Sequence, residues 1–146
     1  MKSGVKVKRV QLTDNHSSNS AIIGIVSAEP DYKLSLALNR KLKISLRNDS
    51  PITINEDGGN NTAFSRFSDV SGSPHLYYDL TSNRAGKNFL LKKLKNIDFI
   101  FQVHNPDGDE TVRKITVTLK EIECVTAVFL INPSTIKDKN IQYVIQ

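Results

Sequence analysis

The residues of this 146-residue chain best suited to chemistry are three histidines and one cysteine. His104 stands out, because the segment His104-Asn-Pro-Asp-Gly-Asp-Glu sets an imidazole beside three carboxylates. That pairing could serve acid–base chemistry, but no nucleophile lies close in sequence. Its spacing does not match an EF-hand, and zinc sites need more His or Cys. We therefore expect these acidic residues to start a helix, with Asp107 as its cap and Asp109 and Glu110 near the positive end of its dipole.

The other candidates have simpler interpretations. His16 lies in a Ser- and Asn-rich connection and His75 opens a strand, so we expect both at or near the surface. Cys124 adjoins an apolar stretch and is the only cysteine, which favours a core position and excludes an internal disulfide. The segment Gly58-Gly-Asn-Asn-Thr lacks the spacing of a phosphate-binding loop and is typical of a hairpin tip. The sequence thus predicts no catalytic residue, no metal site and no cofactor.

Charge is the remaining signal for a partner. The chain carries 20 Lys and Arg against 15 Asp and Glu, a net charge of +5. Most of the basic residues fall in three acid-free runs, within residues 2–9, 33–47 and 84–95. If these runs converge, they form a patch able to neutralise phosphates. The candidate nucleic-acid contacts are Arg40, Lys41, Lys43, Arg47, Lys87, Lys92, Lys93 and Lys95.

Two observations weaken that hypothesis. Phe64, Phe67, Tyr77 and Tyr78 could offer a stacking surface for bases, but adjacent residues of a strand point to opposite faces. The sequence also contains no RNP-like or helix-turn-helix signature. Scattered lysines on helices are usually a solvated surface.

Length and hydropathy favour one cytoplasmic domain spanning residues 1–146. The longest apolar stretches, residues 21–26 and 125–131, are six and seven residues long. A membrane helix needs about 20 apolar residues, so we expect no membrane span. No continuous apolar segment follows the basic N-terminus, which argues against a secretory signal.

The first half of the chain is predicted to contain two strands and a helix. Residues 5–12 begin with alternating Val and Lys, and the strand predicted over residues 21–27 is apolar from 21 to 26, so these two strands could form a hairpin. Pro30 suits the first turn of a helix whose apolar stripe is formed by Leu34, Ala37, Leu38 and Leu42. Pro51 then marks the start of a short extended piece over residues 52–54.

The second half is predicted to be mostly strands. A polar loop over residues 55–62 leads to an antiparallel hairpin of strands 64–70 and 75–82. An amphipathic segment, 89–95, precedes a central strand, 97–103. Residues 107–123 fit both a strand and a helix, and the acidic N-terminal end favours the helix. Residues 125–131 are predicted as a buried strand, and residues 141–145 as an edge strand.

This order of elements predicts an α+β fold. A mostly antiparallel sheet would carry two helices packed on one face, and the chain would end in a strand-helix-strand unit. That last unit could supply a parallel pair of strands.

Three segments resemble the IPExxxVDY family, small bacterial proteins with no assigned function. Residues 23–27 and 31–42 are similar to its apolar strand and D-Y-[KR]-L helix start, and residues 122–134 to its ending of helix, strand and [DN]-P-S turn. The family signature would fall on residues 91–99, where Asp98 is identical but Lys92 and Lys93 replace Pro and Glu. The resemblance supports a helix over residues 109–122 and implies no activity.

The leading expectation for function is a non-catalytic cytoplasmic protein-interaction module, with a homodimer as one form. Apolar strands such as 125–131, able to pair across a two-fold axis, favour it. The alternatives are a basic nucleic-acid-binding protein and a small-ligand binder or enzyme around His104. A pocket where His104 meets Asp79 or Asp98 would support the last of these.

Overall fold

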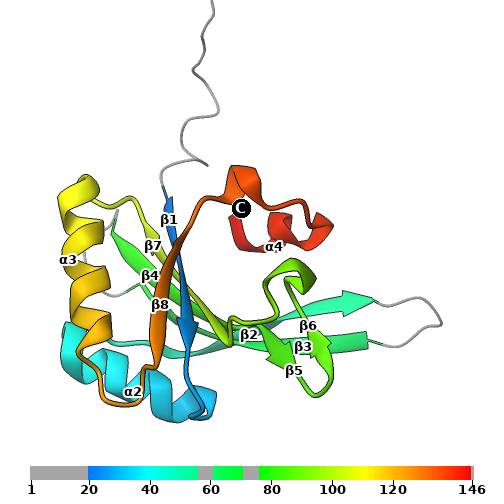
Figure 1. Ribbon diagram of the computed structural model, residues 1–146. Helices are drawn as coiled ribbons and strands as arrows, with labels where there is room; N and C mark the ends of the chain where they lie inside the picture. Colours follow the sequence, from blue (N-terminus) through cyan, green and yellow to red (C-terminus); the bar gives the residue numbers. More distant parts are fainter. Residues whose placement is uncertain (1–19, 56–60, 71–75, 146) are drawn as a thin grey trace, which may run out of the picture.

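A six-stranded antiparallel sheet organises the computed structural model, which describes residues 20–55, 61–70 and 76–145 (Figure 1). The order of strands across the sheet is β2-β3-β4-β7-β1-β8. Their bounds are Ser20–Val26 for β1, Arg47–Asn55 for β2, Asn61–Asp69 for β3, Tyr77–Ser82 for β4, Phe99–His104 for β7 and Ala127–Ile131 for β8. The predicted α+β class and antiparallel sheet are confirmed.

Strands β7 and β1 form the middle of the sheet. Every residue of β7 is buried, and β7 pairs with β4 on one side and β1 on the other. In β1, Ile23 lies opposite Phe101, and its neighbour Ile22 lies opposite Gln102. Since successive side chains point to opposite faces, these two pairs belong to different faces of the sheet.

Helices α2 (Asp31–Leu42) and α3 (Asp109–Lys120) cover one face (Figure 1). Leu34 and Leu38 of α2 and Leu119 of α3 are fully buried in the larger apolar core, against Phe101 of β7. The apolar stripe predicted for α2 therefore packs as expected. Pro30 is the cap residue just before α2 rather than part of its first turn.

The helix interpretation of residues 107–123 is confirmed, but its predicted cap is wrong. Gly108, with φ of 127°, occupies the N-cap position, and no side chain caps the helix. Glycine readily adopts that backbone angle, whereas a residue with a side chain rarely does. The acidic pair Asp109 and Glu110 occupies the first turn as predicted.

The opposite face of the sheet is covered by short elements. A small ribbon of β5 (Arg84–Ala85) and β6 (Asn88–Phe89) leads into a 3₁₀ turn, η2 (Lys92–Leu94). The C-terminal segment adds the 3₁₀ turns η3 (Pro133–Thr135) and η4 (Lys139–Ile141) and the short helix α4 (Gln142–Ile145). A second apolar cluster fills this side, made by Ile22, Ile54, Phe64, Leu90, Leu91, Ile100 and Val144.

The prediction of an edge strand over residues 141–145 is wrong. Asp138 accepts a hydrogen bond from the backbone N–H of Asn140, which starts a helical turn. The buried side chain of Asn140 donates to the carbonyl of Leu90, and Val144 is buried in the second cluster. These contacts hold the tail across the sheet face.

Two other strands differ from prediction. Residues 125–131 were expected to be buried throughout, but β8 is an edge strand with Leu130 largely exposed. Strands β7 and β8 run parallel but do not pair, because β1 lies between them and is antiparallel to both. Strand β2 is longer than expected and contains Pro51 at a shift of register between Asp49 and Ile52.

The predicted antiparallel hairpin is confirmed by the pairing of β3 with β4, and β2 also pairs antiparallel with β3. The predicted strand over residues 5–12, His16, His75 and most of the loop at residues 55–62 lie outside the described residues. No helix among those described is long and apolar enough to cross a membrane.

Asn83 joins three separate parts of the fold. Its side chain is fully buried, donates from Nδ2 to the carbonyls of Leu94 and Ile97, and accepts from the N–H of Leu91. The three bonds connect the end of β4 to η2 and to the start of β7. A buried amide is suited to this position because it donates and accepts together.

We expect Asn83→Asp to destabilise the protein by about 3 kcal/mol at pH 8, since the two carbonyls lose their donors. Burial would raise the pKa of the introduced carboxyl above about 3.9, so the loss should grow as pH rises and shrink toward pH 4. Urea unfolding at both pH values measures it. Asn88→Asp, at an exposed amide that bonds Thr62, is the matched control. An equal effect of both substitutions would contradict this role.

Candidate functional site

His104 lies at the end of β7, between two neighbouring strands. The register places it opposite Tyr77 of β4 on one side and opposite Ser20 of β1 on the other. Residues directly opposite each other share a face, so the three side chains lie in one row on the face that α4 covers. His104 is only 6% exposed.

Both ring nitrogens of His104 have a partner. Nε2 lies 2.7 Å from Asp79 Oδ2, and Nδ1 lies 3.1 Å from Ser20 Oγ. Asp79 comes from β4, two residues after Tyr77, and therefore from the same face. Ser68 of β3 donates its hydroxyl to the other oxygen of Asp79. One chain of polar contacts thus crosses four strands.

The imidazole is also fixed by stacking. The Tyr77 ring lies over the His104 ring with centroids 4.1 Å apart and planes 9° from parallel. Stacking and two hydrogen bonds together leave the ring little freedom to turn.

The pKa of Asp79 lies below its usual range. Burial raises this pKa, but the hydrogen bonds from His104 and Ser68 and the electrostatic interactions with His104 and Arg66 together outweigh burial. Asp79 is therefore ionised at neutral pH and can only accept hydrogen bonds. The hydrogen between Asp79 and His104 consequently belongs to Nε2.

This pair lines a cavity of ≈ 520 Å³ between the sheet and the C-terminal segment. Gln102, Arg66 and Tyr143 also line it. The side chain of Gln102 donates to the carbonyl of Val144, which fastens α4 to the sheet. Arg66 bonds the carbonyl of Ser50 and lies 3.4 Å from Asp49.

The sequence predicted only part of this site. It named His104 and offered Asp79 or Asp98 as partners, and the structure brings Asp79 there. Asp98 instead lies 2.6 Å from Arg84 and accepts from the N–H of Ser27. The carboxylates next to His104 in sequence, Asp107, Asp109 and Glu110, are all exposed, and Glu110 pairs with Arg113 on the surface of α3.

Ser20 was missed. The only signal in the sequence would have been its place at the start of a buried strand, because strand alternation alone cannot give the pairing partner.

The structure separates the predicted basic residues. Arg40 and Lys41 end α2 and Lys43 follows it, on the side of the two helices, whereas Arg47 begins β2 opposite Ser68, on the face that α4 covers. Lys92, Lys93 and Lys95 lie in and beside η2, whose neighbours Leu90 and Leu91 also pack on the α4 side of the sheet. Lys87 lies between β5 and β6. The run at residues 2–9 is outside the described residues.

Acidic side chains accompany the basic residues of α2. Lys41 lies 3.5 Å from Glu121, and both line a cavity of ≈ 560 Å³ with Arg40 and Glu123. Cys124 lies half-buried at that cavity and packs against the larger core. The charges here are mixed, so the described residues offer no single basic surface, and nucleic-acid binding stays a prediction.

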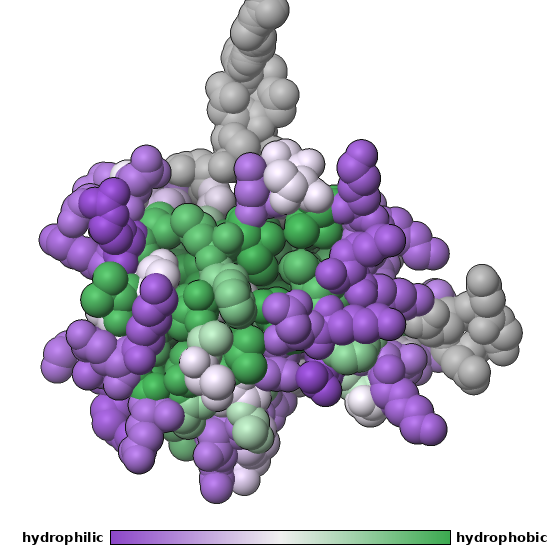
Figure 2. Space-filling model, viewed as in Figure 1, coloured by the Kyte–Doolittle hydropathy of each residue, from purple (hydrophilic) through white to green (hydrophobic). Residues whose placement is uncertain are grey.

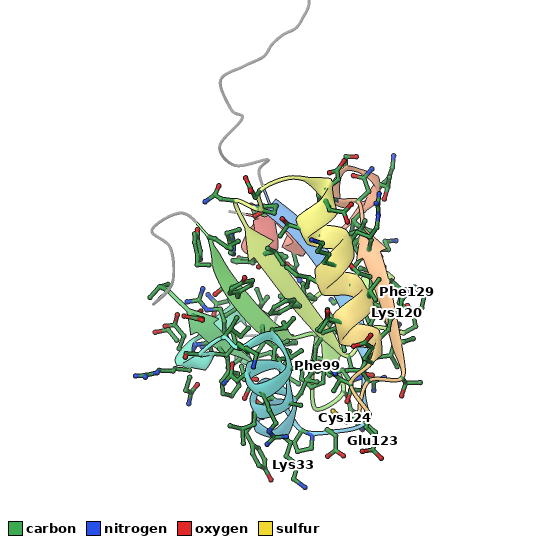
Figure 3. The ribbon with its side chains drawn as sticks, turned by 90° about the vertical axis from the view of Figure 1, so that its left-hand side faces the viewer. Lys33, Phe99, Lys120, Glu123, Cys124 and Phe129 are labelled. Atoms are coloured by element: carbon green, nitrogen blue, oxygen red, sulfur yellow. The ribbon has the colours of Figure 1, made fainter. Side chains whose placement is uncertain are left out.

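The β8 edge is the second notable feature. Figure 2 shows apolar side chains gathered where Figure 1 draws β8 and its neighbours. Phe129 is 44% exposed and Leu130 is 64% exposed, and Val117 of the adjoining helix α3 is exposed as well. Figure 3 shows Phe129 at the outer border of the molecule. A patch of this kind at a sheet edge is typical of an interaction surface.

No model of a known protein family matches the chain, and no curated protein matches it. The resemblance to the IPExxxVDY family therefore stays a prediction. Within residues 20–55, 61–70 and 76–145, no group of three or more His, Cys, Asp or Glu could hold a metal ion.

We expect Asp79→Asn to destabilise the protein by about 1–3 kcal/mol at pH 7, since the ionised acceptor of two buried hydrogen bonds is lost. Asp79 has a lowered native pKa, so its contribution is present above the unfolded value of about 3.9 and is lost as pH falls through the native one. The difference between wild type and variant should therefore narrow below about pH 4. Urea unfolding at pH 7, 4 and 3 measures it.

Asp49→Asn is the matched control for that measurement. Asp49 also has a lowered pKa, chiefly through the backbone N–H of Ser50, but its ion pair with Arg66 is exposed. Its replacement should change stability by no more than about 0.5 kcal/mol. Equal losses for the two variants would contradict the role given to Asp79.

Proposed function

We propose that this protein is a cytoplasmic module that works through protein contacts, and that two copies assemble by antiparallel pairing of their β8 strands. The observation that carries the proposal is an edge strand with apolar side chains on both of its faces. An edge strand offers unpaired backbone N–H and C=O groups that another strand can bind.

The two faces of β8 are defined by its register with β1. Phe129 lies opposite Gly24 and Leu130 opposite Ile23, so Phe129 belongs to the α4 side and Leu130 to the helix side. Each side chain extends the apolar surface of its face to the border of the sheet. Such a pattern is typical of a strand whose two faces are both covered.

The opposite edge of the sheet, formed by β2, has features that prevent pairing, and β8 lacks them. Strand β2 carries Arg47 and Asp49, contains Pro51 and shifts register between Asp49 and Ile52. Charges, proline and irregular register are the features that keep an edge from pairing. Residues 125–132 contain no charged residue and no proline. Of the two sheet edges formed by the described residues, the β8 edge is thus the one suited to accept a further strand.

A second copy fits this edge well. If the two-fold axis passes through Phe129, then Phe129 meets its own copy on one face, and Leu130 meets Val128 of the other copy on the other face. Apolar side chains face apolar side chains throughout this register. The uncharged strand brings no like charges together across the axis.

We expect Leu130→Lys to convert a dimer into a monomer, because it places a charge against apolar residues in both copies. Light scattering coupled to size-exclusion chromatography should give twice the chain mass for wild type and the single-chain mass for the variant. Leu130 is exposed in the single chain, so the monomeric variant should remain folded, and its unfolding midpoint should no longer rise with protein concentration.

Leu36→Lys is the control, since Leu36 of α2 is 56% exposed but lies away from β8. It should leave the dimer intact. A monomeric wild type, or a dimer that survives Leu130→Lys, would rule out pairing through β8.

A further inference from the structure

We propose that Ser20, His104 and Asp79 form a nucleophile relay that hydrolyses carboxylic esters. Ser20 is the nucleophile, His104 is the general base and Asp79 is a positioning residue. The three are brought together from β1, β7 and β4, and Ser20 and His104 are separated by 84 residues in the chain. The inference is independent of assembly through β8.

The position of each hydrogen follows from the contacts. Ionised Asp79 accepts the hydrogen of His104 Nε2, so in the neutral imidazole Nδ1 carries a lone pair. Ser20 Oγ, 3.1 Å away, can meet that lone pair only by donating its hydroxyl hydrogen. A hydroxyl that donates to an imidazole held by a carboxylate is the arrangement that activates a serine.

The base is held in place by two direct contacts and one indirect one. Tyr77 stacks on the ring of His104, Asp79 bonds Nε2, and Ser68 bonds the remaining oxygen of Asp79. His104 and Asp79 have side chains only 8% and 13% exposed. Groups that are already fixed lose little conformational entropy when the reaction occurs, and this is how positioning increases the rate.

The nucleophile is more accessible than its base. Ser20 is half-buried at the start of β1. The pairing of β1 with β8 ends at Ile22, which lies opposite Ile131, the last residue of β8. Ser20 therefore extends two residues beyond the end of β8, and β8 does not cover its outer side. Within the described residues Ser20 is half-buried and His104 is buried, so an ester would meet Ser20 Oγ before it met the imidazole.

The reaction has two steps. In the first, Ser20 Oγ attacks the carbonyl carbon, its proton passes to His104 Nδ1, the C–O bond to the alcohol breaks, and the leaving alcohol takes that proton. In the second, water attacks the acyl group on Ser20, its proton passes to Nδ1, and the carboxylic acid leaves as Ser20 recovers its hydrogen. We assign no oxyanion donor among the described residues, so the relay favours esters of good leaving groups such as phenols.

The test uses the full chain and a fluorophosphonate, with which the Ser20 oxygen displaces fluoride from phosphorus. Peptide mass spectrometry of the wild-type protein should place the adduct on Ser20. Ser20→Ala should abolish the adduct, and His104→Gln should slow its formation by about 100-fold or more. Phenyl acetate hydrolysis should fall in parallel.

Two variants separate catalysis from structure. Ser65→Ala removes another half-buried hydroxyl bonded to a carboxylate, Asp31 Oδ2 at 2.5 Å, and should leave labelling of Ser20 unchanged. Asp79→Asn can turn its amide NH₂ toward Nε2, which moves the ring hydrogen to Nδ1 and removes the base. Labelling of the folded Asp79→Asn chain should fall and its pH profile should change.

Mapping the adduct on the wild-type protein tests whether Ser20 is the nucleophile even if His104→Gln does not fold. A folded wild-type chain with no adduct on Ser20 between pH 5 and 9 would overturn the proposal. So would labelling that proceeds equally fast in folded Asp79→Asn.

Discussion

The pairing of β1 with β7 is the constraint on which the rest of the structure depends. It joins segments about 80 residues apart in a single register, from Ser20 opposite His104 to Ile25 opposite Phe99. Because side chains alternate, that register sends Ile25 and Phe99 to the helices and Ser20 and His104 to the other face. A slip of one residue would exchange the two faces and remove both the core and the polar row.

The polar row is tolerated in the sheet because its members satisfy one another. Burying a carboxylate and an imidazole is costly unless each finds partners, and here Ser68, Asp79, His104 and Ser20 bond in sequence across β3, β4, β7 and β1. Apolar contacts alone would accept several registers. Directional bonds accept one, so the row also fixes how the four strands align.

The sequence predicted the elements better than their environment. Local patterns were sufficient for α2, the β3–β4 hairpin and β7, because each lies within a few residues, whereas α3 also needed its acidic N-terminal end to separate a helix from a strand. Local periodicity could not place residues 125–131 at an edge. An apolar strand indicates that its side chains will be buried, but not whether residues of the same chain or of a partner bury them. The site was half predicted for the same reason: His104 and Asp79 were named from their types, whereas Ser20 enters through a pairing between distant strands.

The two proposed features share β1 without competing for it. Strand β8 occupies the outer side of β1 only from Ile22 to Val26, and a second copy would add beyond β8 rather than over Ser20. The relay needs only β3, β4, β7 and β1, all supplied by one chain. Assembly should therefore leave the nucleophile open, and a monomeric variant should keep the relay. A variant that loses assembly but keeps Ser20 reactivity, or the reverse, would then assign assembly to β8 and reactivity to the row across β3, β4, β7 and β1.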